Sequence, residues 1–400
     1  MRGHTVTLRW EGNLGAYGGR RERLSFSYQA FVPDAIADFD PRVSFDAAAS
    51  IDDAERAIEH LNTTAGALTL EAVGPLLLRS EALASSRIEG YQVSQRNLAR
   101  ALVDPRAAKG TARTVAANVV AMEEAIAVAE RPDQLRPADL DRIHALVMAD
   151  APPRLQPGAV RTEQNWVGGS AGSPRAAAYV PPPEGDVPRL VADLVQFAER
   201  TDLPAVAQAA IAHAQFETIH PYLDGNGRVG RALIHLILRR RGLAPKFVPP
   251  VSTVLVARPD AYVGGLVAFR EGDVEAWCAS FAAACQVAAT ESEELAREVA
   301  ELQDAWLRQA SVRRDSTAAR IIRLLPAQPI TSAATIRAAA GSSHQKSLEA
   351  LKHLEASGVV RQISEGGYDR QYAADGLFSL IEAFEARVGM PQARGNLSSP

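Results

Sequence analysis

The sequence is poor in cysteine and has little net charge of either sign. Among 400 residues there are only two cysteines, Cys278 and Cys285. One disulfide at most could form, which excludes a fold held together by disulfides and favours a reducing compartment. We expect both cysteines to be small buried residues on a helix. The formal net charge of −4 gives no general attraction to nucleic acid or to an anionic membrane.

Long apolar runs are also missing. No stretch approaches the roughly 20 apolar residues that a membrane-spanning helix needs, and the polar, glycine-rich segment 1–19 has no apolar run typical of a signal peptide. Hydrophobic residues make up 47% of the chain and charged residues 22%, as in ordinary globular proteins of two or three domains. The sequence therefore predicts a soluble cytoplasmic protein that does not contact a membrane.

Alanine and leucine recur at helical spacing along most of the chain, which predicts a mainly α-helical fold. Residues 1–50 are rich in Gly, Pro and Asp, and we expect them to be irregular. The predicted helices are 51–88, interrupted near 63–66 and closed by Gly90, then 111–130, 137–149, 187–199, 205–219, 229–241, 259–270 and 273–308, the last in one or two pieces.

The segment 150–186 differs from its helical surroundings. It contains Pro152-Pro153, Gly168-Gly169 and Pro181-Pro182-Pro183. A segment of this composition inside a helical domain favours a functional loop or hairpin over a linker, with a plain turn as the structural alternative. Tyr179-Val180 precedes the prolines and should be extended, because residues before proline avoid the helical region.

The C-terminal part shows the winged-helix pattern of three short helices followed by a hairpin. The helices are expected at 318–325, 332–339 and 343–357, and the strands at 359–364 and 369–373 around Glu365-Gly366-Gly367. Between residues 318 and 376 there are seven basic and five acidic residues. Because a surplus of two is small for a DNA-binding surface, DNA binding and protein interaction both stay open for this domain.

The central motif, residues 220–231, reads His-Pro-Tyr-Leu-Asp-Gly-Asn-Gly-Arg-Val-Gly-Arg. Gly225, Asn226 and Gly227 tolerate a positive φ, and a helix follows directly. A glycine-rich turn that leads into a helix N-terminus offers free N–H groups and the positive end of the helix dipole. The turn therefore predicts a phosphate-binding site.

Ionisable residues flank this turn. Arg228 and Arg231 are three apart and share one face of the first helical turn, where a bound anion would offset their unfavourable position at a helix N-terminus. Asp224 is the lone carboxylate that Mg²⁺ uses beside phosphates. Histidine, with an ordinary pKa of about 6.5, suits His220 to take a proton from a hydroxyl. Together these residues predict attack of a hydroxyl on a nucleotide phosphate.

This arrangement resembles the signature of the Fic family, His-x-Phe-x-(Asp/Glu)-Gly-Asn-Gly-Arg-x-x-Arg. The sequence departs from it only at Tyr222, where an aromatic residue expected to pack inward replaces phenylalanine. The resemblance covers about residues 25–310 and implies a mainly α, Fic-type helical core with a short β-hairpin flap. Similar flanking features are Pro157-Gly158, Arg161, 165–169 and 178–183.

The organisation that follows has four parts. An N-terminal region at 1–110 contains an inhibitory helix at about 65–90, and a Fic catalytic core spans 111–310. A winged-helix-like domain at 316–385 and a tail at 386–400 complete the chain.

The resemblance implies a protein adenylyltransferase, which moves AMP from ATP to a Ser, Thr or Tyr hydroxyl of a target protein. His220 would be the catalytic base and Asp224 would hold Mg²⁺, or Mn²⁺ in its place. The remaining implied roles are an anion hole at the backbone of Gly225, Asn226 and Gly227, phosphate contacts from Arg228, a γ-phosphate contact from Arg231, and a flap at Ala178, Tyr179, Val180 and Pro181 that docks the target by strand addition.

A second segment, Ser85-Ser86-Arg87-Ile88-Glu89-Gly90, resembles the inhibitory motif of the same family, (Ser/Thr)-x-x-x-Glu-(Gly/Asn). Ser85 and Glu89 are four apart, on one helical face. The resemblance implies that Glu89 pairs with Arg231 and keeps the γ-phosphate from binding productively. In some relatives the same glutamate helps to remove AMP, and whether this chain does so stays open.

Two alternatives remain. One is a winged-helix DNA-binding regulator that uses the Fic core as a nucleotide sensor, and the other is a transferase that uses UTP, GTP or another nucleotide donor. An intact His220 and Asp224 favour catalysis, because nucleotide binding alone would need neither. The implied partners are ATP and an unidentified target protein, while self-modification and a homodimer stay open.

Overall fold

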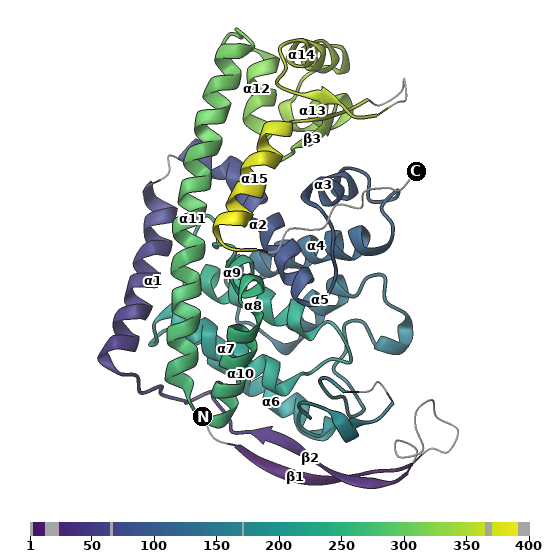
Figure 1. Cartoon of the computed structure of the whole chain (residues 1–400), viewed down its shortest axis with the longest axis vertical. Helices are drawn as coiled ribbons and strands as arrows, with labels where there is room; N and C mark the ends of the chain where they lie inside the picture. The colour runs from purple at the N-terminus through teal and green to yellow at the C-terminus, as the bar shows by residue number, and fades with distance from the viewer. Residues whose placement is uncertain (1–2, 13–23, 65–66, 170–171, 365–369, 391–400) are drawn as a thin grey trace. The chain divides into compact units, whose positions relative to one another are not determined.

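The computed structural model describes residues 3–12, 24–64, 67–169, 172–364 and 370–390. It is mainly helical, as predicted, with two small antiparallel sheets (Figure 1). The chain forms two compact units, each built from separate stretches. The first contains 1–53, 120–241 and 260–283, and the second contains 54–119, 242–259 and 284–400. None of the helices in the described ranges is long and apolar enough to cross a membrane.

The first unit begins with a β-hairpin, where we predicted irregular structure. Strand β1 (Gly3–Trp10) pairs antiparallel with β2 (Phe26–Pro33) over their whole length, with Gly3 opposite Pro33. The prediction was wrong because Gly and Pro around the strands hid the alternation within them. In β1 the partly buried residues are Val6, Leu8 and Trp10, at the period of two that a strand requires.

Helix α7 (Ala205–Ile219) lies at the centre of the first unit. Every residue of it except Glu217 is buried, which is typical of a helix surrounded by others. It packs between α6 (Val187–Ala198) and α8 (Asn226–Arg240). At Gly230 of α8 an added Cβ would lie 3.0 Å from the ring of Phe216, so glycine permits the close approach of α7 and α8.

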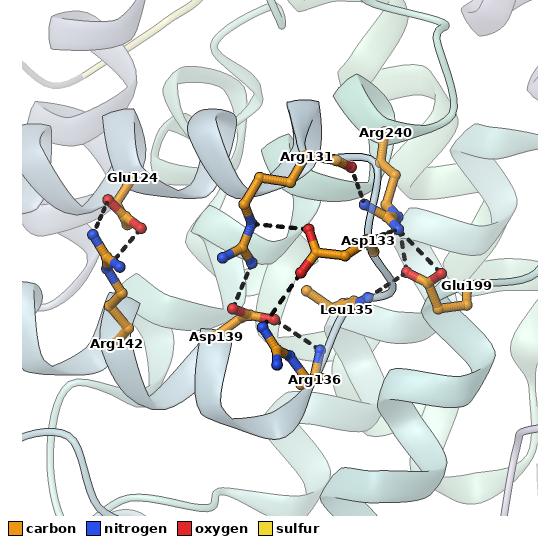
Figure 2. A network of polar contacts seen from close by, with 9 residues as sticks. All are labelled: Glu124, Arg131, Asp133, Leu135, Arg136, Asp139, Arg142, Glu199 and Arg240. Carbon is orange, nitrogen blue, oxygen red and sulfur yellow. Dashed lines mark hydrogen bonds and ion pairs between the residues drawn. The ribbon is translucent and has the colours of Figure 1, made fainter.

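A polar network fixes the turn between α4 (Gly110–Glu130) and α5 (Pro137–Val147), as Figure 2 shows. Asp139 accepts hydrogen bonds from the Arg131 guanidinium (2.5 Å) and from the backbone N–H of Arg136 (2.8 Å). Glu199, after α6, accepts from the N–H of Leu135 at 3.0 Å. The network ties the first turn of α5 to its neighbours and so sets the course of that helix.

In the second unit α2 (Ala67–Ile88) packs against α9 (Val251–Ala257) and α3 (Gln95–Val103). Glu81 of α2 is buried, and its carboxylate accepts from the N–H of Ser252 at 2.8 Å, which satisfies a free donor in the first turn of α9.

The C-terminal part of this unit contains the predicted helices and strands. Helices α12 (Thr317–Leu324), α13 (Ala333–Ala340) and α14 (His344–Ala356) pack together (Figure 1). The predicted hairpin strands appear as β4 (Arg361–Gln362) and β5 (Gln371–Ala373), in a sheet of order β3-β5-β4. Its turn at Glu365-Gly366-Gly367 and the end of the tail lie outside the described residues. The winged-helix interpretation stays a prediction.

Several elements differ from those predicted. Helices α3 and α9 and strand β3 (Ile330–Ser332) were not predicted, because short elements give little periodic signal. Helix α15 (Asp375–Arg387) was not predicted either, although it has 13 residues. Helix α11 (Val274–Gln309) is one continuous helix. The other described elements are α1 (Phe45–Thr64), α10 (Pro259–Glu271) and the 3₁₀ turns η1 (Pro153–Leu155), η2 (Pro174–Ala176) and η3 (Glu184–Asp186).

Both cysteines lie in α11 and are buried, as predicted. Burial raises the pKa of the Cys278 thiol to about 12 and raises the pKa of Cys285 as well. Neither thiol is therefore poised to react as a thiolate at neutral pH.

The network at Asp139 gives a stability prediction. Asp139→Ala removes the acceptor of two donors, so we expect the free energy of unfolding in urea to fall by about 1–3 kcal/mol. The control is Glu124→Ala, which removes the partner of Arg142, a side chain that is 63% exposed, and should cost less than about 1 kcal/mol. Equal losses in the two variants would contradict the structural role of Asp139.

Candidate functional site

The candidate site is the turn between α7 and α8, where two residues adopt left-handed conformations. His220 ends α7 with φ 50° and ψ 61°, and Gly225 begins α8 with φ 80°. The side chain of Asn226 closes the turn, because its Oδ1 accepts from the N–H of Tyr222 (2.8 Å) and its Nδ2 donates to the carbonyl of Tyr222 (2.7 Å). Helix α8 thus begins at Asn226, earlier than the predicted residue 229, with its positive end at this turn.

Arg161 and Asn165 hold the backbone of His220 in place. Nε of the Arg161 side chain donates to the His220 carbonyl at 3.0 Å, and the backbone N–H of Arg161 donates to the carbonyl of Pro221 at 2.9 Å. Nδ2 of Asn165 donates to the carbonyls of His220 (3.3 Å) and Tyr222 (2.8 Å). A positive φ is unfavourable for a side chain as large as that of histidine, and such a conformation persists where the surroundings fix it. These two residues supply that constraint.

Arg161 is itself buried, with 1% of its surface exposed, and burial lowers its pKa to about 10. It is therefore still charged at neutral pH. Besides the bonds to the α7–α8 turn, its guanidinium donates to the carbonyl of Pro182 at 2.6 Å and to that of Glu163 at 3.1 Å. One cation thus joins the turn to both ends of the 161–182 segment.

The His220 side chain is partly exposed, at 21%, and can meet a reactant from outside. Its Nδ1 lies 3.9 Å from Oε2 of Glu217, one turn earlier in α7. A carboxylate at this distance stabilises the imidazolium that forms when the histidine accepts a proton. Sequence reasoning did not single out Glu217, although its spacing of three from His220 places both on one helical face.

Asp224 is exposed, and its Oδ1 accepts from the N–H of Gly225 at 2.6 Å. In this conformation one of the three predicted anion-hole donors is therefore engaged by Asp224. Among the described residues no three His, Cys, Asp or Glu side chains gather into a metal cage. Mg²⁺ commonly takes one or two carboxylates together with substrate phosphate oxygens and water, and an exposed lone carboxylate fits that mode.

Both arginines of the motif are buried, Arg228 at 2% exposure and Arg231 at 1%. The Arg228 guanidinium donates to the carbonyl of Val147 (3.3 Å) and contacts Sδ of Met148 (3.4 Å), at the C-terminus of α5. The negative end of the α5 dipole favours a cation there. Arg231 contributes positive charge beside His213, whose pKa is lowered to about 3 by burial and, to a smaller extent, by this arginine.

Helix α5 supplies a residue that sequence reasoning missed. His144 is fully buried, its Nδ1 accepts from the N–H of Gly158 (3.0 Å), and its Nε2 lies 3.0 Å from the carbonyl oxygen of Asp224. Its ring stacks on Tyr222 with the centroids 3.8 Å apart. Burial lowers the pKa of His144 to about 4, so the ring is neutral at neutral pH. The apolar spacing of α5, with Leu140 and Val147 on the same face, was the available signal.

Tyr222 packs inward, as expected. It is fully buried, and its hydroxyl donates to Oδ1 of Asp141 at 3.0 Å. Burial raises the pKa of the phenol. The hydroxyl that distinguishes this residue from phenylalanine therefore has a partner of its own.

The predicted flap is a small hairpin. Val167 and Tyr179 form an antiparallel bridge, with the N–H of Val167 donating to the Tyr179 carbonyl at 2.8 Å. Gly168 and Gly169 have φ values of 73° and 74°, and an added Cβ on Gly169 would lie 2.5 Å from the carbonyl oxygen of Ala176. Glycine is therefore required where this hairpin turns. Residues 170–171 lie outside the described residues.

The four flap residues differ in exposure. Ala178 is exposed, whereas Val180 and Pro181 are buried. Tyr179 is anchored, because its hydroxyl donates to the carbonyl of Thr218 in α7 at 2.7 Å. Burial raises the pKa of that hydroxyl. The flap thus has an exposed residue at Ala178, whose backbone N–H donates to the carbonyl of Val167 at 2.9 Å, and a Tyr179 side chain fixed to the helix that carries His220.

The predicted inhibitory residues lie at the end of α2. Ser85 is buried within the helix, whereas Glu89 is exposed and follows its last residue. The N–H of Tyr91 donates to the carbonyl of Ser86 and the N–H of Gly90 to that of Arg87, both at 3.0 Å, with Gly90 at φ 84°. This is the Schellman arrangement that ends a helix. Glu89 is thus the C-cap rather than a mid-helix residue, and its pairing with Arg231 stays a prediction.

Comparisons with known proteins agree with this site. Residues 134–238 match the family model of the Fic/DOC family, and residues 48–127 match that of the Fic/DOC family N-terminal region. Protein adenylyltransferase fic-1 of Caenorhabditis elegans is 32% identical over 117 residues, and protein adenylyltransferase Fic of Drosophila willistoni is 33% identical over 114 residues. These matches cover 29% and 28% of this chain but only 22% and 21% of the relatives, so the chain spans about a fifth of their length.

Solved structures show the same fold. A Fic family protein from Desulfovibrio desulfuricans is similar over 84% of this chain and 98% of its own, with a TM-score of 0.52 and 22% identity. Fic-1 from Caenorhabditis elegans is similar over 63% of this chain and 73% of its own, with a TM-score of 0.50 and 20% identity. The chain thus contains a segment that matches the Fic/DOC family, preceded by a segment that matches the N-terminal region of that family.

The left-handed start of α8 gives a second prediction. Gly225→Ala places a Cβ 2.9 Å from Sδ of Met148, whereas Gly242→Ala, at φ 71°, meets nothing within 4 Å. Both variants adopt an unfavourable φ, but only the first also displaces Met148 and its contact with Arg228. We expect Gly225→Ala to lower the free energy of unfolding in urea by about 1 kcal/mol more than Gly242→Ala. Equal losses would show that Met148 does not restrict this turn.

Proposed function

We propose that the protein is a protein adenylyltransferase that transfers AMP from ATP to the hydroxyl of a Ser, Thr or Tyr residue in a target protein. The observation that carries the proposal is the α7–α8 turn, which presents His220, Asp224 and the positive end of α8 together. Relatives with the name protein adenylyltransferase, about a third identical over the matched segment, support the same reaction.

In the proposed reaction the target hydroxyl oxygen attacks the α-phosphorus of ATP. The new oxygen–phosphorus bond replaces the bond to the oxygen that bridges the α- and β-phosphates, and pyrophosphate leaves. His220 accepts the hydroxyl proton as general base, for which its partial exposure suits it. The Glu217 carboxylate, 3.9 Å from Nδ1, then stabilises the imidazolium.

The start of α8 would bind the phosphates. The helix dipole and the two buried arginines supply positive charge for the triphosphate, with Arg231 assigned to the γ-phosphate. Asp224 would hold Mg²⁺, or Mn²⁺ in its place, against the phosphates, where the cation neutralises charge and orients the α-phosphate. Since Oδ1 of Asp224 accepts from Gly225, Oδ2 would be the oxygen left to hold the cation.

Target docking is assigned to the flap. The edge of the flap at the exposed residue Ala178 would accept an extended segment of the target by strand addition, a mode that depends on backbone hydrogen bonds and tolerates varied side chains. The bond from Tyr179 to the Thr218 carbonyl would keep this edge at a fixed distance from the end of α7, which carries His220.

We assign Glu89 as an autoinhibitory residue that acts on Arg231 within the same chain. A carboxylate and a γ-phosphate compete for the same guanidinium, since each forms paired hydrogen bonds with it. Gly90 supports the assignment, because it ends α2 directly after Glu89 and places the carboxylate at the helix end.

The proposal is tested by intact-protein mass spectrometry after incubation with ATP and Mg²⁺. We expect Glu89→Gly to gain the mass of one or more AMP groups by self-modification, while the wild type gains much less. The matched control is the double variant Glu89→Gly/His220→Ala, which should gain none.

Each other outcome is informative. Labelling of Glu89→Gly with UTP or GTP but not with ATP would replace the adenylyl donor by another nucleotide. No labelling with any of the three nucleotides would contradict the proposed transferase activity. Equal labelling of the wild type and Glu89→Gly would contradict the proposed autoinhibition by Glu89.

A further inference from the structure

The C-terminal half of α5 contacts the α7–α8 turn at three separate points. Arg228 donates to the carbonyl of Val147, Met148 fills the space beside Gly225, and His144 reaches the carbonyl of Asp224. Of these three contacts, only that of His144 is made with Asp224, the residue proposed to hold the cation.

The hydrogen bonds of His144 define its tautomer. Nδ1 accepts from the N–H of Gly158, so in the neutral ring the proton is on Nε2, which donates to the carbonyl of Asp224. The N–H on the other side of the same peptide group, that of Gly225, donates to the Asp224 carboxylate. The peptide between Asp224 and Gly225 is thus held at both its C=O and its N–H, which fixes the direction in which the Asp224 side chain leaves the backbone.

From this geometry we propose that His144 is a positioning residue that orients Asp224 for the cation of the bound nucleotide. The inference rests on the proposed function, and His144 itself contacts neither nucleotide nor cation in it. Residues that orient a metal ligand commonly change metal affinity by about 10–100-fold when they are replaced.

The test compares two amides that mimic different halves of the ring. The amide of His144→Gln reaches the position of Nε2 and can donate to Asp224, whereas that of His144→Asn reaches only the position of Nδ1. Both are made in the full-length Glu89→Gly/His220→Ala chain, which binds ATP without turnover. Calorimetry gives the affinity for ATP in EDTA and the affinity for ATP at increasing Mg²⁺ concentrations. From these we obtain the Mg²⁺ concentration at which half of the Mg²⁺-dependent gain in ATP affinity is reached.

We expect His144→Asn to raise this Mg²⁺ concentration by about 10-fold or more, with the affinity in EDTA unchanged, and His144→Gln to stay near the parent. An unchanged Mg²⁺ requirement in His144→Asn, or an equal rise in both variants, would overturn the positioning role. Labelling of Glu89→Gly by ATP tests the proposed function separately, so the two can fail independently.

A different set of contacts joins the inhibitory helix α2 to the C-terminal segment 317–390 of the same unit. Arg79 of α2 is 7% exposed, and its guanidinium donates to the carbonyls of Pro326 (2.8 Å) and Ala327 (2.6 Å). These two residues lie between α12 and β3. Displacing this buried arginine would leave its guanidinium and two carbonyls without their hydrogen bonds, which is unfavourable, so this attachment is firm.

A second attachment meets α2 at the neighbouring residue, Ser80, through Gln95. Gln95, the first residue of α3, donates to Oγ of Ser80 in α2 (3.3 Å) and to Oε1 of Glu385 in α15 (2.8 Å). Glu385 is 5% exposed, and Arg87 of α2 contributes favourable charge to it. Segment 317–390 therefore contacts α2 directly at Arg79 and, through Gln95, at Ser80, while Glu385 interacts electrostatically with Arg87, two residues before Glu89.

The two attachments lead us to infer that segment 317–390 is part of the autoinhibitory device and acts as a clamp on α2. Arg79 is about 15 Å from Glu89 along the helix axis, and a rigid helix transmits a change at one end to the other. Releasing the clamp would let Glu89 leave its inhibitory position. The inference rests on the proposed function and on the assigned role of Glu89.

The clamp is tested by self-modification of the full chain. Arg79→Ala should raise AMP incorporation by about 5-fold or more over the wild type, and Gln95→Ala, a milder variant, should raise it in the same direction. The matched control is Arg297→Ala, since Arg297 is exposed and pairs with Glu294 and Glu301 along α11, and it should leave incorporation unchanged. Circular dichroism verifies that each variant is folded.

The double variant Arg79→Ala/Glu89→Gly separates a clamp from a general effect. It should incorporate AMP at the rate of Glu89→Gly alone, because without Glu89 there is no autoinhibition left for the loss of the clamp to relieve. Wild-type rates in both Arg79→Ala and Gln95→Ala, or an equal increase from Arg79→Ala with and without Glu89, would overturn the clamp. Absence of labelling in Glu89→Gly would instead overturn the proposed function, and the clamp with it.

Discussion

The buried guanidinium of Arg161 is the interaction on which the site depends. His220 sits in a left-handed conformation that its side chain disfavours, and its carbonyl is held by Arg161 and by Asn165. The same guanidinium donates to the carbonyl of Pro182, just beyond the flap. The backbone that carries the proposed base and the backbone that leads out of the flap therefore share one cation, which donates its hydrogen bonds to carbonyl groups.

The fold could be predicted well where the signal is local. Helix α7 appears at its predicted bounds, and the turn after it contains the motif residues within one short stretch, so their proximity needed no tertiary information. The hairpin β1–β2 was missed because strand pairing joins residues far apart in the sequence. Helix α15 was also missed, and its buried Glu385 contacts Gln95, 290 residues earlier in the chain.

The site was only partly predictable. His144 and Glu217 carry no signature of their own, and their importance comes from where α5 and α7 place them relative to Asp224 and His220. Arg228 has another stabilising contact at the helix start besides a bound anion. The C-terminus of α5 already offers that guanidinium a carbonyl and a favourable dipole, which no spacing within the motif could reveal.

The Schellman turn at Gly90 gives α2 a defined end, and so a defined rotational position for Glu89, the C-cap that follows its last residue. An α-helix turns by about 100° for each residue. Inserting or deleting a single residue between Arg79 and Gly90 would therefore swing Glu89 around the helix axis by more than a quarter of a circle, while the attachment at Arg79 stayed where it is. The number of residues between Arg79 and Gly90 therefore sets the direction of the Glu89 carboxylate around the helix axis as well as its distance from Arg79 along that axis.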